Sequence, residues 1–429
     1  MTETGSPRYI PIEDYGIIGD TCSAALVSRS GSIDWLAWPR FDSPSIFARL
    51  LDSDRGGFFS IAPVEPFESE RHYLEDTNVL VTTFTTASGR FTVTDLMPAF
   101  PELTTERLTP FRSIIRRIEG VEGTVAIEMI YDPRIGYGQK STRLSSRGNS
   151  TIFCARGQDA LYLRSTAPLQ LDGSRECARA KLRVARGETV DFSLAYNDIA
   201  PAVLPPLEEA ATEEIDATID YWESWADRIN YDGPFSNMVR RSALTLKLLC
   251  YSPSGAVIAA PTTSLPEWIG GDRNWDYRFC WLRDASFTVR SLYDLHCQRE
   301  AESYVGWLLH ATRLSHPRLR VLYDVYGETR LHESEVDLDG YRSSRPVRTG
   351  NGAHAQKQLD VYGEVMGALM HHVEEGHELQ RTERRFAEGL ADYVADHWCE
   401  ADDGIWEERA PRRQHVHAKV RCWAALVNA

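Results

Sequence analysis

The stretch "NVLVTTFTTASGRFTVTDLMP", residues 78–98, decides the fold of the first half of the chain. β-Branched and aromatic residues fill both of its arms, and small polar turn residues separate them, a pattern that predicts an antiparallel hairpin. Residues 114–132, "IIRRIEGVEGTVAIEMIYD", and 180–198, "AKLRVARGETVDFSLAYND", repeat the design. Many short strands joined in this way predict an antiparallel β-sandwich, which we expect to occupy residues 1–205.

The pattern changes from strand to helix after three prolines at 201, 205 and 206. "ATEEIDATIDYWESWADRI" (211–229) has the pattern of an acidic amphipathic helix, so residues 206–233 are predicted to be a helical linker. Residues 234–429 are predicted to form an all-α domain, with helices near 235–251, 285–297, 300–314, 357–375 and 386–398. The apolar positions expected on helix faces are Phe235, Met238, Val239, Leu246 and Leu249, and Phe386, Leu390, Val394 and Trp398.

Composition narrows the classes of function. A chain of 429 residues is long enough for two domains, and its net charge of −15 argues against nucleic-acid or anionic-membrane partners, which need clustered cations. Neutral substrates fit better. The eight cysteines have no CxxC pairing and are predicted to be reduced, buried thiols. With no signal-peptide pattern at the start, the expected location is the cytoplasm.

Two loops concentrate side chains suited to binding a sugar. In "GGDRNWDYRFCWLRDASF" (270–287), aromatic residues alternate with charged ones, and adjacent Arg283 and Asp284 could hydrogen-bond a pyranose from two directions. The alternative is a buried ion pair beneath an aromatic core. In "DDGIWEERAPRR" (402–413), a tryptophan precedes Glu407 and Glu408, which could equally be two solvated loop acids.

These stretches carry a resemblance to a known family. "RNWDYRFCWLRDASF" (273–287) resembles the first signature of glycoside hydrolase family 15, the glucoamylase and bacterial trehalase family. "GIWEERAPRRQHVHAKVRCWAAL" (404–426) resembles its segment around the catalytic acid. Residues 12–52, 241–267 ("RSALTLKLLCYSPSGAVIAAPTTSLPE") and 344–365 ("SRPVRTGNGAHAQKQLDVYGEV") are similar to the bacterial branch, so the resemblance extends from residue 12 to 429.

The resemblance implies a β-sandwich followed by an (α/α)6 barrel. It also implies hydrolysis of terminal α-glucosidic bonds, in an α-glucan, a maltooligosaccharide or trehalose, with inversion. One carboxylic acid protonates the leaving oxygen and a second carboxylate, about 6.5–9.5 Å away, activates water. Glu407 matches the acid, which needs a raised pKa that burial beside Trp406 would provide. The positions that match substrate contacts are Tyr277, Trp281, Arg283, Asp284, Trp406 and Glu408.

The second carboxylate is not evident in the sequence. The family's base lies far downstream of the acid, yet residues 409–429 contain no Asp or Glu. The chain also ends within the apolar helix pattern "VHAKVRCWAALVNA". We therefore expect a C-terminally truncated chain with an incomplete barrel, exposed inner helix faces and little hydrolysis on its own. Asp276, Asp284 and Asp360 are the nearest replacements, and the first two are expected to be occupied by other roles.

Other motifs are weak. "HESEV" (332–336) lacks the second histidine of a zinc-binding HExxH, "VDLDGY" (336–341) has only part of a calcium loop, and no phosphate-binding loop is present. We expect no cofactor and no metal. Ala410 replaces a glycine common in the family, and Glu408 replaces an apolar residue frequent in the trehalase branch. The alternatives to a hydrolase are a non-catalytic sugar-binding remnant and a phosphorylase of the same architecture.

Overall fold

The computed structural model describes residues 9–99, 112–139, 142–156, 159–197 and 206–429. The chain forms two compact units. The first, here called the β unit, extends to Asp227 and also contains residues 265–273 and 336–347. The second, the helical unit, contains residues 228–264, 274–335 and 348–429. Two short segments that the sequence placed in the all-α domain therefore belong to the β unit.

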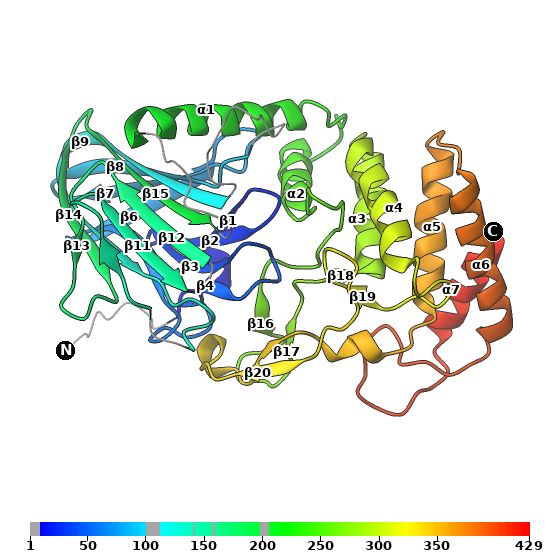
Figure 1. Cartoon of the computed structure of the whole chain (residues 1–429). Coiled ribbons are helices and arrows are strands. Elements are labelled where there is room, and N and C mark those ends of the chain that lie inside the picture. The colour runs from blue at the N-terminus through cyan, green and yellow to red at the C-terminus, as the bar shows by residue number, and fades with distance from the viewer. Residues whose placement is uncertain (1–8, 100–111, 140–141, 157–158, 198–205) are drawn as a thin grey trace. The chain divides into compact units, whose positions relative to one another are not determined.

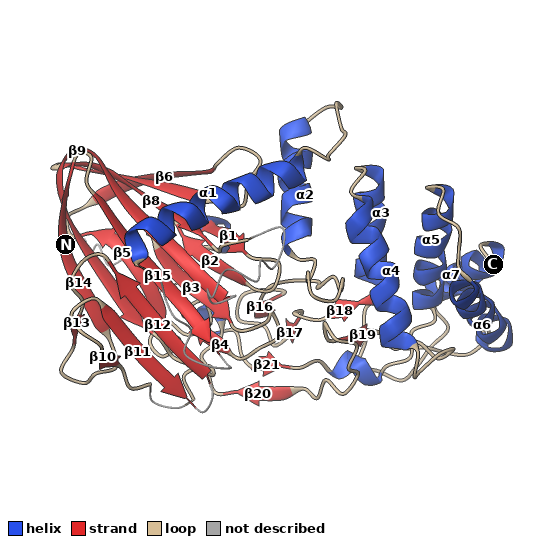
Figure 2. Ribbon diagram, turned by 45° about the horizontal axis from the view of Figure 1, so that its top comes forward, coloured by secondary structure: helices blue, strands red, loops and turns tan. Residues whose placement is uncertain are grey.

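The β unit is built from two antiparallel layers joined by one long strand, β9 (Arg112–Asp132) (Figure 2). One layer contains β1 (Tyr15–Gly19), β2 (Ala24–Ser28), β3 (Ser32–Ala37), β4 (Ser45–Phe47), β5 (Phe58–Pro63), β13 (Gln170–Leu171) and β14 (Ala178–Ala185). The other contains β6 (Phe67–Tyr73), β7 (Leu80–Thr86), β8 (Gly89–Leu96), β10 (Ser145–Ser146), β11 (Thr151–Arg156), β12 (Asp159–Ser165) and β15 (Thr189–Asn197). Both layers contribute buried residues to a single apolar core, which makes the unit a sandwich.

The predicted hairpin at 78–98 is confirmed, because β7 and β8 pair antiparallel and Phe84 stacks on Phe91 across them. The other two predicted hairpins are wrong. Residues 114–132 lie in the single strand β9, whose first half pairs with β8 and β15 and whose second half pairs with β5 and β14. Strands β14 and β15 thus pair with β9 and not with each other. Gly120 lies where β9 changes layer, and a Cβ there would approach the carbonyl oxygen of Ala185 to 2.0 Å.

The helix predicted after the prolines is confirmed as α1 (Leu207–Ala226), but it is not a free linker. Its Ala211 and Ile215 pack against Val79, Leu96 and Ile115 of the β unit. It therefore forms part of that unit.

The core of the β unit encloses one charged pair. The guanidinium of Arg116 lies 2.6 Å from the carboxylate of Asp95, and neither side chain has exposed surface. Arg116 also donates to the carbonyl oxygens of Phe59 and Gly31. These bonds satisfy the buried guanidinium from both layers of the sandwich.

The helical unit holds six α-helices, and none of its residues is missing from the description. They are α2 (Ser236–Leu248), α3 (Leu282–Asp294), α4 (Gln298–Thr312), α5 (Asp360–Glu374), α6 (Arg381–His397) and α7 (Val416–Val427). Helix α3 packs on α4 and α5, and α5 packs on α7 (Figure 1). The connecting segments carry the short strands β16 (Thr263–Pro266), β17 (Asn274–Asp276), β18 (Cys280–Trp281), β19 (Leu322–Tyr323), β20 (Ser334–Val336) and β21 (Val347–Thr349). Each helix predicted beyond residue 234 is present, whereas the full (α/α)6 barrel stays a prediction of the resemblance.

The helix faces were predicted with mixed success. In α6, Phe386, Leu390 and Val394 are buried as predicted, but Trp398 is exposed. In α2 the predicted face is wrong, since Phe235 and Met238 are exposed and the buried residues include Ala243, Leu244 and Leu248. The α2 sequence carries apolar residues on more than one side, so periodicity alone did not identify the packed one.

The cysteines form no disulfide in the described residues, and seven of the eight are buried. Cys399 is exposed, contrary to the prediction that all are buried. Across the ranges that the structure describes, none of the helices combines the length and the apolar character needed to cross a bilayer.

Candidate active site

Glu407 lies in a turn between α6 and α7 whose backbone is constrained. Its N–H donates to the carbonyl oxygen of Gly404 at 3.2 Å, and its φ of 53° is in the left-handed region, which is costly for a residue with a Cβ. The side-chain amide of Gln356 donates to the Glu407 carbonyl oxygen at 3.2 Å. The turn is thus held by a segment more than fifty residues earlier in the chain.

The carboxyl group of Glu407 is mostly enclosed. Its side chain is 20% exposed, and its Oε1 accepts a 2.7 Å hydrogen bond from the indole N–H of Trp281. The guanidinium of Arg283 lies 3.6 Å from the same oxygen. Burial raises the pKa of Glu407 and outweighs the Trp281 hydrogen bond and the Arg283 charge, both of which lower it. A carboxyl with a raised pKa is suited to donate a proton.

Arg283, at the start of α3, shares its charge among several acceptors. It lies 3.3 Å from the carboxylate of Asp284 and 3.9 Å from that of Asp360, and it donates to the side-chain oxygen of Gln358 at 3.3 Å. Burial raises the pKa of Asp284, although the Arg283 charge lowers it. At Glu407 as at Asp284, burial raises the pKa by more than the Arg283 charge lowers it.

A pocket of about 390 Å³ opens beside these residues. Arg283 and Asp284 form its charged edge, and Ile405 connects it to the turn that carries Glu407. The remaining wall is mainly apolar and consists of Leu246, Leu249, Val257, Ile258, Ala259, Phe287 and Thr288. A few polar groups converging on a concave apolar surface are typical of a small-molecule site.

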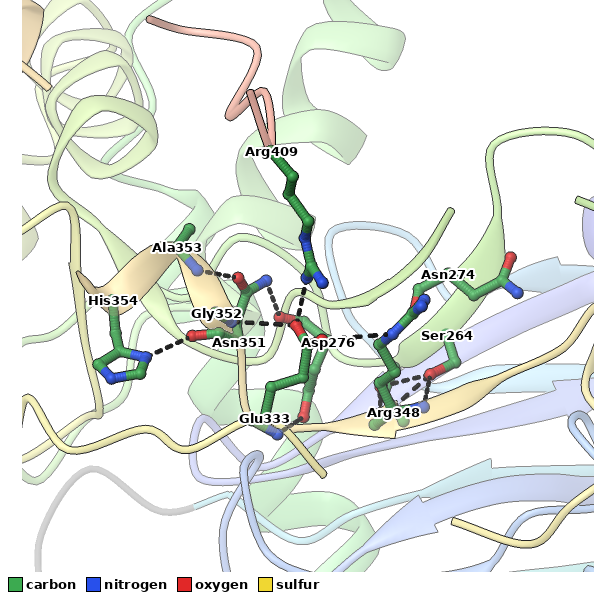
Figure 3. Close-up of polar contacts among 12 residues, drawn as sticks. Ser264, Asn274, Asp276, Glu333, Arg348, Asn351, Gly352, Ala353, His354 and Arg409 are labelled. Atoms are coloured by element: carbon green, nitrogen blue, oxygen red, sulfur yellow. Dashed lines mark hydrogen bonds and ion pairs between the residues drawn. The ribbon is translucent and has the colours of Figure 1, made fainter. Parts of the chain in front are cut away.

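A second network holds the other side of the Glu407 turn (Figure 3). Glu333 accepts from the guanidinium of Arg409 at 2.6 Å and from the Gly352 N–H at 3.0 Å. Arg348 and Arg409 both lie over the ring of Trp275, 4.5 and 4.2 Å from its centre. Burial alone would raise the pKa of Glu333, but the bonds from Arg409 and Gly352 outweigh it and lower that pKa. The residue two positions after Glu407 is thereby fixed by a charged pair.

Two family models and several curated proteins match this chain. The model of glycosyl hydrolases family 15 matches residues 233–429, and a trehalase-like N-terminal model matches residues 5–215. The trehalase of Mycolicibacterium smegmatis is 35% identical over 97% of this chain and 65% of its own length. The trehalase of Thermoplasma volcanium is 32% identical over 100% of this chain and 67% of its own length. The chain belongs to glycosyl hydrolase family 15.

This family 15 chain spans about two thirds of the length of the curated relatives that it matches. Among solved structures, a putative kojibiose phosphorylase from the human microbiome covers 88% of this chain, and the match covers 56% of that protein, at 9% identity and a TM-score of 0.43.

The structure brings together three residues that the family 15 resemblance assigned, Glu407, Arg283 and Asp284. Trp281 also lies at this site, but it is fully buried and donates to Glu407, so its ring offers no face to a sugar. Tyr277 packs against Trp281 with ring centres 5.5 Å apart and is partly exposed.

Trp406 does not enclose Glu407 as expected, and the substrate contacts of Trp406 and Glu408 stay predictions. Trp406 is 85% exposed and Glu408 is also exposed, so Trp406 is not what buries Glu407. The enclosure comes instead from Trp281 and Arg283, more than 120 residues away in sequence. Such burial by distant residues cannot be recognised from the spacing of neighbours in a loop.

Of the three replacement candidates for the base, Asp284 is partly exposed at the pocket edge and pairs with Arg283, whereas the other two are buried in other contacts. Asp276 is buried and accepts two hydrogen bonds from the Arg278 guanidinium, one from the Arg278 backbone N–H and one from the Gly350 N–H. Asp360 is also buried, with Arg283 and His417 each 3.9 Å from its carboxylate. Neither carboxylate has exposed surface from which to activate a water.

Several residues of the site were missed by the sequence reading. Gln356 and Gln358 lie within the stretch 344–365 that carries the resemblance, but no role was assigned to them. Glu333 was considered only as part of an incomplete zinc motif, whereas it bonds Arg409. The two glutamines could have been suspected from the sequence because they lie in the stretch 344–365, which is similar to the family.

Proposed function

We propose that this chain carries the proton-donating part of a site that hydrolyses trehalose with inversion. Glu407 protonates the glycosidic oxygen as the bond between that oxygen and the anomeric carbon breaks. The relatives named trehalase support this substrate. The single observation that carries the proposal is the enclosed carboxyl of Glu407, with its raised pKa, hydrogen-bonded to Trp281 beside a pocket.

In this proposal Arg283 and Asp284 bind hydroxyls of one glucose unit. They form the charged edge of the pocket, and charged groups make the stronger hydrogen bonds to neutral hydroxyls. The apolar wall, with Phe287 and Leu249, faces the C–H groups of the ring. The proposed substrate, trehalose, is a neutral disaccharide, so binding it requires no cluster of charges in the site.

The water-activating carboxylate is proposed to lie outside residues 1–429. Residues 409–429 contain no acid, and Asp276 and Asp360 are buried in other contacts. Losing one acid–base partner typically costs about 10²- to 10⁴-fold in rate. We therefore expect this chain alone to hydrolyse trehalose slowly.

Azide provides a test of this reading because it needs no base. It attacks the anomeric carbon from the face opposite the leaving glucose, while the Glu407 proton passes to the leaving oxygen, giving β-glucosyl azide and glucose. We expect azide to raise the rate of trehalose consumption by about 10-fold or more, which recovers part of the rate that the missing base would have contributed. The product is identified by NMR.

Two variants control this experiment. E407Q should abolish formation of the azide product, whereas E408Q, at the adjacent exposed acid, should retain it. Persistence of the product in E407Q would refute the role of Glu407. Saturable trehalose binding that D284A weakens, with no turnover even in azide, would instead identify a sugar-binding protein.

A further inference from the structure

A second cavity, of about 340 Å³, lies within the β unit and shares no lining residue with the pocket beside Glu407. It is here called the β pocket. Its walls come from β1 and the segment that leads into it, from the β2–β3 turn, from β3, from the segment after β4, and from β6. Small-molecule pockets cover a range of about 300–1,000 Å³. The β pocket is at the lower end of that range, so it suits a compact ligand.

Side chains of β6 fasten this strand to β1 and to the β2–β3 turn. The Tyr73 hydroxyl accepts from the N–H of Ile17 at 2.8 Å and donates to the carbonyl oxygen of Ile17 at 2.9 Å. The Ser69 hydroxyl donates to the carbonyl oxygen of Arg29 at 2.9 Å. Two walls of the β pocket are therefore held together before any ligand arrives. Binding there would not have to order them, which lowers its entropic cost.

Asp34 and Arg49 form a charged part of the β pocket. Asp34 is buried and accepts from the hydroxyls of Tyr15, at 2.8 Å, and Ser32. Burial raises the pKa of Asp34, and the nearby charge of Arg49 opposes that rise. The Arg49 guanidinium lies over the ring of Phe58, 4.2 Å from its centre, and has no hydrogen-bond acceptor among the residues that the structure describes. A guanidinium carries five N–H donors, so those of Arg49 are available to a ligand.

The charges on the lining are balanced in pairs. The Nε of Arg29 lies 3.1 Å from the carboxylate of Asp14, and the charge of Arg49 is near that of Asp34. A carboxylate beside each cation disfavours an anionic ligand. Hydroxyl groups both donate and accept, so they can bond arginine and aspartate together. Phe67, which is 36% exposed, also lines the cavity and offers apolar surface to the C–H groups of a ring.

We propose that the β pocket binds a neutral sugar of one or two rings, at a site separate from the one at Glu407. The same combination of an arginine–aspartate pair and an apolar surface lines the pocket that holds Arg283 and Asp284. Binding in the β unit does not depend on whether Glu407 donates a proton. The two sites can therefore be tested independently.

The test is saturation-transfer NMR of the full chain, with glucose and trehalose as the probes. The D284A background is used because that substitution weakens sugar binding beside Glu407. We expect D284A to keep saturable binding of at least one of the two sugars. Adding R49Q should weaken this binding by about 10-fold or more, because the bonds from a charged donor are lost. R147Q is the matched control. Arg147 also lies over a phenylalanine ring, 4.8 Å from the centre of Phe153, but it does not line the β pocket.

F67A provides a second variant, on an exposed position of β6, in case R49Q does not fold. It should also weaken sugar binding in the D284A background, and circular dichroism checks that each variant is folded. Absence of saturable sugar binding in D284A would overturn the proposal. Binding that neither R49Q nor F67A changes, or that R147Q weakens equally, would do the same. Displacement of the sugar by inorganic phosphate would identify an anion site and would also contradict it.

Discussion

At the scale of single residues, the buried carboxyl of Glu407 has a consequence for stability. Its pKa is raised in the folded state, so between the ordinary glutamate pKa and the raised one the folded chain binds more protons than the unfolded chain. Ionised Glu407 therefore destabilises the fold as pH rises through that window. We predict that E407Q raises the unfolding free energy at pH 7 by about 1 kcal/mol.

The pH dependence makes this prediction specific. The gain should shrink as pH falls through this window and be lost below the ordinary glutamate pKa, where both folded and unfolded chains carry a protonated Glu407. Urea unfolding at several pH values measures it, with E408Q as the control because Glu408 is exposed. A gain that is equal at all pH values, or a loss at pH 7, would contradict a raised pKa.

Residue identities were better predicted from the sequence than residue environments. Glu407, Arg283 and Asp284 were assigned by resemblance, and the structure brings them together. The burial of Glu407 was attributed to Trp406, its neighbour in sequence, whereas the enclosing groups are Trp281 and Arg283. Motifs indicate which residues act, but burial depends on contacts between segments far apart in the chain.

At the scale of elements, the packing of α5 on α7 depends on one glycine. A methyl group at Gly363 would meet the Arg421 backbone, whereas one at Gly367 in the same helix meets nothing within 4 Å. We predict that G363A lowers the unfolding free energy by about 1–3 kcal/mol through overpacking. G367A should be neutral or stabilise by up to about 1 kcal/mol, because alanine is the better helix former.

Urea unfolding followed by circular dichroism compares the two variants directly. Equal effects of G363A and G367A would show that the close approach of the two helices does not matter for stability.

Elements were predicted unevenly. The segments of helices α3 to α7 were all recognised as helical, and α6 follows from its apolar positions four residues apart. The strands were also recognised, but two of three pairings were wrong, because alternation shows that a strand has a buried face without naming its partner. Strand β9 illustrates this, since its two halves pair in different layers.

At the scale of the whole molecule, each unit has its own core, and that of the β unit contains the Arg116–Asp95 pair. Removing one partner leaves the other charge buried, so we predict that R116M lowers the unfolding free energy by about 3–5 kcal/mol. R179M is the matched control in the same unit. Arg179 pairs with Glu128 of β9, the strand that carries Arg116, and this exposed pair is worth less than about 1 kcal/mol.

Infrared amide bands of sheet and helix follow the two units during denaturation. In R116M the sheet band should change at a lower denaturant concentration than the helix band. Similar small effects of R116M and R179M on the unfolding free energy would show that the buried Arg116–Asp95 pair does not matter for the stability of the β unit.

The division into a sheet-rich and a helical part followed from the change of period near residue 205, but its details did not. Residues 265–273 and 336–347 belong to the β unit although they follow the first helices in sequence. Nothing in their composition distinguishes them from other loops between helices. Such returns of the chain to an earlier unit depend on packing and have no local signature.

The most direct test of the account is a measurement of the pKa of Glu407 in the folded chain. Carbon-13 NMR of labelled glutamate carboxyls, assigned with E407Q, gives this value, and the indole N–H signal of Trp281 should titrate with it. We predict a pKa above the ordinary glutamate range and a further rise in W281F, since the Trp281 hydrogen bond lowers it. A Glu407 pKa at or below the ordinary range, or a fall in W281F, would contradict its assignment as the proton donor.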